Sequence, residues 1–123
     1  MTSYDESNVF ARILRGEIPC DKIYEDEHVL AFRDINPQAP VHVLVIPKGA
    51  YASFDDFAER GSQEEQAAWV RAIGAVARQE GLGQRGYRVL ANAGSDGHQE
   101  VPHLHMHVFG GRDLGAMLGR PKP

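Results

Sequence analysis

The chain has 123 residues, a formal net charge of −4 at pH 7 and 42% hydrophobic residues, which fits one folded domain and excludes disorder over most of its length. Its 13 Lys and Arg residues form no basic run, which argues against a nucleic acid partner. One cysteine excludes an internal disulfide, and no apolar run approaches the roughly 18 residues of a membrane span, so we expect a cytoplasmic protein that does not associate with membranes.

The first half of the chain contains one expected helix and three expected strands. Apolar residues at helical spacing predict a helix over residues 9–14, and alternating residues predict strands over 22–26 and 29–34. Two prolines mark residues 36–40 as a loop. The segment 41–46 is almost entirely apolar, so both of its faces must be covered, and we expect it near the centre of a sheet.

The second half of the chain continues the mixture of helices and strands. Residues 53–60 predict a short helical turn, and a capping box begins a longer helix over 62–81. Alternation predicts strands over 86–92 and 103–109. Strands outnumber helices and the connections are short, so we expect an α+β domain with a mainly antiparallel sheet.

A run of alternating histidines is the strongest chemical signal in the sequence. The last expected strand places His103, His105 and His107 on one face, toward a cleft, and apolar residues on the other. The pattern is compatible with a plain amphipathic strand, or with a metal site that also uses Cys20 or His42. His103 and His107 would lie about 13 Å apart, however, too far for all three histidines to bind one zinc ion. A third interpretation is a row of nucleophile, proton donors and anion ligands for a phosphoryl or acyl centre.

Residues 103–109 match the signature His-φ-His-φ-His-φ-φ, in which φ is apolar, so the sequence resembles the histidine-triad nucleotide-binding proteins. The match spans about residues 8–118, and we expect one such domain over 1–118 and a flexible tail over 119–123. His107 stands where the nucleotidyltransferase branch has Gln, which favours the hydrolase and binding branches. Further segments resemble the Hint-like branch in order and spacing, namely 18–19, 24–26, 31–32, 34–40, His42, 45–48, Asn92 and 110–112.

The resemblance also implies a fold and an assembly. The family fold is a five-stranded antiparallel sheet with two helices, extended by homodimerisation through the long helix and the adjoining strand. Trp69, Ile73 and Val76 are expected to supply apolar surface for that contact. Some relatives bind a structural zinc through a cysteine pair, which Asn8 and Ala11 replace here, so the resemblance implies no metal and no cofactor.

A catalytic role for each histidine follows from the resemblance. His105 would be the nucleophile that attacks the α-phosphorus of a nucleoside monophosphate derivative and forms a nucleotidyl-histidine. His107 would contact the phosphate oxygens or the leaving group, and His103 with His42 would order the imidazole cluster. Such chemistry needs one neutral ring, held by a hydrogen bond on its far nitrogen, and donors for the charge on phosphate oxygen.

The substrate contacts implied by the resemblance come from several parts of the chain. Asp34 would accept both ribose hydroxyls, because a carboxylate has enough acceptor sites for a vicinal diol. Glu100 would favour an amine as leaving group, and His98 either crowds the phosphate loop or supplies a further donor. The phosphate set would be Asn92, Gln99 and the backbone near Val101, and the walls of the base pocket would be Val9, Phe10, Ile13, Phe32, Ile35 and Leu44.

These features together favour a homodimeric purine nucleoside phosphoramidase that hydrolyses AMP-amidate-type P–N bonds. Its partners would be purine nucleoside monophosphates such as AMP and GMP, and their amidates. Two other functions stay open at this point. One is a nucleotide-binding regulatory module with negligible turnover, and the other is a dinucleoside polyphosphate hydrolase of the Fhit-like branch.

Overall fold

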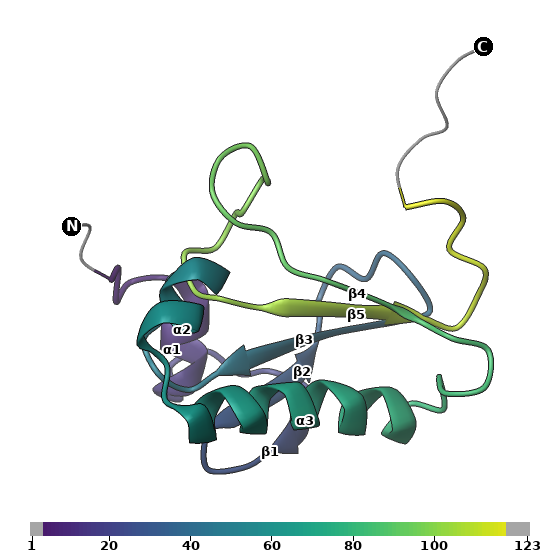
Figure 1. Cartoon of the computed structure of the whole chain (residues 1–123), viewed down its shortest axis with the longest axis horizontal. Helices are drawn as coiled ribbons and strands as arrows, with labels where there is room; N and C mark the ends of the chain where they lie inside the picture. The colour runs from purple at the N-terminus through teal and green to yellow at the C-terminus, as the bar shows by residue number, and fades with distance from the viewer. Residues whose placement is uncertain (1–3, 118–123) are drawn as a thin grey trace.

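A computed structural model of the chain describes residues 4–117. Five antiparallel strands form one sheet in the order β1-β2-β3-β5-β4, with the long helix α3 packed along one face (Figure 1). The expected flexible tail over 119–123 lies outside the described residues. The strands are β1 (Lys22–Glu25), β2 (Val29–Arg33), β3 (Val41–Pro47), β4 (Arg88–Leu90) and β5 (Met106–Gly110).

The helices are α1 (Val9–Leu14), α2 (Phe54–Arg60) and α3 (Gln63–Gln79). The described residues thus contain three helices where the resemblance implied two, because the short turn expected over 53–60 is a seven-residue helix capped by the Ser53 side chain. The expected capping box of α3 is present, with Ser62 and Glu65 bonded reciprocally. None of these helices is long and apolar enough to cross a membrane.

The face of the sheet under α3 holds the larger of two apolar cores. Val43 and Val45 from β3 and Val108 from β5 are fully buried there against α3. The indole N–H of Trp69 donates to the Val45 carbonyl at 3.0 Å, which fixes α3 to the central strand. Burial of each such large apolar side chain contributes about 1.5–3 kcal/mol to stability.

The three residues of α3 that were expected to supply apolar surface for a dimer contact are buried instead. Trp69, Ile73 and Val76 are only 3%, 9% and 0% exposed within a single chain, because the sheet of the same chain covers them. They form the core cluster with β2, β3 and β5 and offer almost no surface to a second copy. Large exposed apolar side chains include Val70 on α3, which is 64% exposed, and Tyr87 and Val89, which are 44% and 41% exposed beside and within the edge strand β4.

The opposite face of the sheet carries the smaller core and the short helix α1. Phe10 of α1 packs there with Phe32 and Leu44, which come from neighbouring strands. A helix of six residues is not stable alone, so this packing and the Asn8 cap hold it in place. Helix α1 thereby covers part of the sheet face on which His42 and His107 lie.

The last strand is shorter than its sequence pattern. β5 begins at Met106, whereas alternation predicted a strand from 103. The Leu104 N–H donates to the Tyr51 carbonyl at 2.9 Å, before α2, and not to a strand of the sheet. His103, at the end of a bend over residues 101–103, and His105 therefore lie just before the ladder, and the three histidines have different surroundings.

Candidate active site

A cavity of about 570 Å³ lies beside α1, on the sheet face opposite α3. Most of the residues expected at the site line it together, and they come from five segments of the chain. These residues are Val9, Phe10, Ile13, Phe32, Asp34, Ile35, Leu44, Asn92, Glu100, Val101, His105 and His107. His98 also lines it, as do Ile18, Pro19, Cys20 and Arg33, which were not among the expected site residues.

His105 lies at the floor of this cavity and is 6% exposed. Its Nδ1 lies 2.8 Å from the His103 carbonyl oxygen, which can only accept, so Nδ1 carries the proton and Nε2 keeps its lone pair. Burial lowers the pKa of His105, partly opposed by that hydrogen bond and by the acids Asp34 and Glu100. The ring is therefore neutral at pH 7, with one unprotonated nitrogen available for attack.

The backbone of Gln38 sets the tautomer of His107 through His42. The Gln38 N–H donates to Nδ1 of His42 at 3.1 Å, so the proton of His42 must lie on Nε2. That Nε2–H donates to Nδ1 of His107 at 2.9 Å, which places the proton of His107 on Nε2. Burial lowers the pKa of His42, and burial with two neighbouring imidazoles lowers the pKa of His107 to about 4. His107 is thus a neutral ring with one N–H to donate.

His103 does not face the cavity, contrary to the sequence expectation. It is fully buried, its Nε2–H donates to the Pro47 carbonyl at 2.8 Å, and its Nδ1 accepts from the Tyr4 hydroxyl at 2.5 Å. Burial lowers the pKa of His103 to about 4. Its contribution to the site is the backbone carbonyl that holds His105.

Two contacts behind the cavity were not found from the sequence. Tyr4 lies 99 residues from the histidine that it bonds, and no local pattern connects them. Phe109 belongs to the histidine signature as a plain apolar residue, yet its ring lies 4.2 Å from that of His42 and stacks parallel to that of His107. The ring of Phe109 therefore packs against both imidazoles of the relay.

Asp34 lies directly after β2, where its side chain is shared between a turn and the cavity. One carboxylate oxygen accepts the Asn36 N–H at 2.8 Å, and the other lies 3.5 Å from Nε2 of His42. The adjacent Ile35 is 98% exposed and lines the cavity mouth. A carboxylate held in this way keeps free lone pairs for hydroxyl donors.

The segment 92–101 supplies the other wall of the cavity. Gln99, expected to contact phosphate, does not line the cavity and instead braces this segment. Its side-chain amide donates to the carbonyls of Ala52 and Val101, and its oxygen accepts the Gly94 N–H. Gln99 thus holds the loop that carries its cavity-lining neighbours.

Asp34, His42 and His107 place possible metal-ligating atoms within 4.8 Å of one another. The histidine pattern indicated only histidine and cysteine as possible ligands, so this group was not expected from the sequence. The proton on Nε2 of His42 opposes metal binding, because coordination there would require Nδ1 to be protonated and to lose the Gln38 N–H. These residues therefore suit a hydrogen-bonded relay better than a cation, and the absence of a metal stays a prediction.

Residues 15–114 match the family model of the HIT domain, so the chain belongs to the HIT family. This confirms the resemblance seen in the histidine signature. The five-stranded antiparallel sheet that the resemblance implied is present in the structure. One relative, an uncharacterised 13.2 kDa HIT-like protein of Azospirillum brasilense, is 63% identical over 116 residues, or 94% of this chain and 95% of the relative.

Two further relatives carry names that refer to an activity. The purine nucleoside phosphoramidase of Escherichia coli K12 is 44% identical over 115 residues, covering 92% of this chain and 94% of that protein. The crystal structure of a HIT family hydrolase from Legionella pneumophila superposes with a TM-score of 0.82 at 42% identity, covering 88% of this chain and 96% of that one.

Proposed function

We propose that the protein is a hydrolase of the nucleoside phosphoramidase type, which cleaves the P–N bond of purine nucleoside 5′-phosphoramidates. The observation that supports this most directly is the neutral His105, whose unprotonated nitrogen lies at the floor of a cavity of nucleotide size. The similarity to the phosphoramidase of E. coli supports the same reaction class.

The first chemical step forms a covalent intermediate. Nε2 of His105 attacks the α-phosphorus, a P–N(His) bond forms, and the bond to the amine breaks with its electron pair on the departing nitrogen. The amine takes up a proton from water, while the Nε2–H of His107 donates to a phosphate oxygen. The positive charge on the His105 ring is held by its Nδ1–H bond to the His103 carbonyl.

The second step regenerates the enzyme. Water attacks the phosphorus, the P–N(His) bond breaks, and the nucleoside monophosphate leaves with the hydroxyl oxygen while one proton is released. His105 returns to its neutral form because burial disfavours a charged ring at that place.

The rest of the cavity fits a nucleoside. Apolar side chains such as Phe10, Phe32 and Leu44 would enclose the purine, and Asp34 would accept the ribose hydroxyls. Two copies of the chain would pair through the edge strand β4, where Tyr87 and Val89 expose apolar surface. We place the protein in the cytoplasm on its composition and single cysteine.

The experiment is a rapid-quench reaction with an AMP amidate labelled in its α-phosphoryl group, followed by mass spectrometry of the peptide that contains residues 103–107. An acid-labile nucleotidyl adduct on His105 is expected. His105→Gly should lose nearly all turnover and keep AMP binding within a few-fold, whereas His107→Ala should lose roughly 10²–10⁴ in rate.

The same experiment separates the two other functions. AMP binding without turnover of any substrate would indicate a regulatory module, and faster cleavage of a diadenosine polyphosphate than of the amidate would indicate the polyphosphate hydrolase. Full activity of His105→Gly without added imidazole would show that water attacks directly, which would refute the covalent mechanism.

A further inference from the structure

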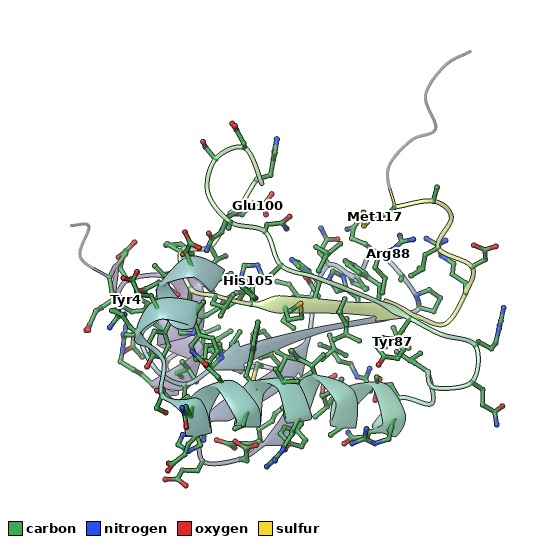
Figure 2. All side chains as sticks on the ribbon, in the orientation of Figure 1. Tyr4, Tyr87, Arg88, Glu100, His105 and Met117 are labelled. Carbon is green, nitrogen blue, oxygen red and sulfur yellow. The ribbon has the colours of Figure 1, made fainter. Side chains whose placement is uncertain are left out.

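The loop before the histidine signature forms an exposed rim over the cavity. His98 and Glu100 line the cavity from this loop and are both exposed, whereas His105 is buried at its floor. Figure 2 shows Glu100 on the loop that arches over His105. A phosphorus atom bound to the floor would therefore have this rim on its outer side.

The direction of attack relates the rim to the leaving group. In phosphoryl transfer the attacking and leaving atoms lie roughly in line on opposite sides of the phosphorus. Attack by His105 from the buried floor sends the leaving amine outward, toward the rim. The base and ribose would lie elsewhere, since Asp34 and the apolar walls occupy the side of the cavity next to α1 and β2.

His98 is held at this rim in an unfavourable backbone conformation. Its φ is +58°, and it is the only non-glycine residue among residues 4–117 with a positive φ. No hydrogen bond engages its imidazole in that part of the chain, so the conformation is not explained by a bond of the side chain. Strain of this kind, kept at the mouth of a cavity, is typical of residues retained for function.

Glu100 gives the rim a negative charge. Its carboxylate has no hydrogen bond or ion pair within the described residues. Arg33, the basic residue that lines the same cavity, is held by Glu80 at 2.6 Å. A positively charged group that enters the rim therefore meets a free carboxylate and no competing cation of the cavity wall.

We propose that His98 and Glu100 form the leaving-group subsite of this hydrolase, and that the subsite favours amines with a second, positively charged group beyond the nitrogen that is released. Glu100 pairs with the distant charge, and the imidazole of His98 packs against the chain between the two ends. This inference rests on the proposed function and names its preferred substrate class.

The test compares three AMP amidates of similar length, made from diaminopropane, propylamine and β-alanine, whose outer ends are positive, neutral and negative. The value of kcat/KM should fall in that order, by about two- to fivefold at each step, as expected for an exposed charge pair. Added salt should reduce the differences, because it screens exposed charges.

Two variants in the same loop test the role of Glu100. Glu100→Gln should lower the ratio of kcat/KM for the diaminopropane and propylamine amidates by about two- to fivefold relative to the wild type. Asp96→Asn is the matched control, because Asp96 is exposed in the same loop and does not line the cavity. This control should keep the wild-type ratio.

His98→Gly tests the second member of the subsite. It should lower kcat/KM for the propylamine amidate, relative to the unsubstituted amidate, by about two- to tenfold, the range of one lost ring contact. The same variant should unfold at a higher temperature, because glycine adopts positive φ without strain. A gain in stability with a loss of discrimination separates a subsite residue from a structural one.

The outcomes distinguish this inference from the proposed function. Loss of charge preference in Glu100→Gln but not in Asp96→Asn supports the subsite. Equal rates for the three amidates, an unchanged ratio in Glu100→Gln, or unchanged discrimination in His98→Gly overturns it while the phosphoramidase function stands. A protein that binds AMP and hydrolyses none of the amidates refutes the proposed function, and the subsite is refuted with it.

Discussion

The buried His103 should make the stability of the fold depend steeply on pH below neutrality. Its pKa is lowered from 6.5 to about 4 by burial, so between these values the unfolded chain binds a proton that the folded chain does not. The stability associated with the neutral His103 ring is therefore fully present above about pH 6.5 and is lost as the pH falls toward 4.

The size of this contribution follows from the two pKa values. One pKa unit corresponds to about 1.4 kcal/mol, so His103 alone should cost about 1 kcal/mol of unfolding free energy between pH 7 and pH 5.5. Between pH 7 and pH 4.5 the cost should reach about 2 kcal/mol.

The assay is urea unfolding of the wild type and of His103→Gln at pH 7, 5.5 and 4.5, at one protein concentration and one ionic strength. The fluorescence of Trp69, the single tryptophan, reports unfolding because the indole is buried against β3. His103→Gln has no titrating group at that position. Between pH 7 and pH 4.5 its free energy of unfolding should therefore fall by about 2 kcal/mol less than that of the wild type.

The two proteins are compared by the slope of their unfolding free energy against pH, and this removes two complications. His103→Gln will be less stable than the wild type at every pH because it disturbs the bonds to Tyr4 and Pro47, but that difference does not change with pH. His42 and His107, which are not among the groups that shift the pKa of His103, titrate in both proteins and contribute equally to both slopes. Parallel pH profiles for the two proteins would refute the reasoning, because they would show that the buried ring releases no proton on folding.

Three further measurements address other parts of the site. In titration calorimetry AMP should bind more tightly than 2′-deoxy-AMP by about 1–3 kcal/mol, because Asp34 would lose one charge-assisted hydrogen bond with the deoxy form. Equal affinities would show that Asp34 does not bind the ribose. Tyr4→Phe should lower kcat several-fold with KM unchanged, since the Tyr4 hydroxyl acts on the nucleophile only through His103. A change in KM alone would contradict that role. Light scattering should give about twice 13.6 kDa, and a Val89→Lys variant should shift this toward the monomer, whereas a wild-type monomer at micromolar concentration would exclude the pairing through β4.

The central strands and the apolar face of the long helix could be predicted from sequence because each depends on local periodicity. β3 spans Val41–Pro47, close to the expected 41–46, and the expected stripe of α3 is buried. The use of that stripe could not be predicted. A periodic apolar face must be covered, but periodicity does not say whether the same chain or a second copy covers it.

The alternation of histidines over 103–109 also predicts the structure only in part. A period of two predicts a strand over 103–109, but only Met106–Gly110 forms one, and residues 101–103 form a bend. Leu104 bonds to Tyr51, 53 positions earlier in the chain, and this long-range contact keeps His103 and His105 out of β5. The cavity-lining residues were largely predictable from the family signature, whereas Tyr4 and the backbone donor at Gln38 depend on contacts that have no sequence pattern.

The donor that begins the imidazole relay belongs to the main chain, and this has a consequence for how the site tolerates mutation. Every residue type except proline would present the same N–H at position 38. Substitutions of the Gln38 side chain therefore leave the proton of His107 on Nε2. The neighbouring Pro37 and Pro40 restrict the path of the loop and keep the donor in place. The protonation pattern of the site is thereby encoded in the course of the backbone, where single substitutions rarely reach it.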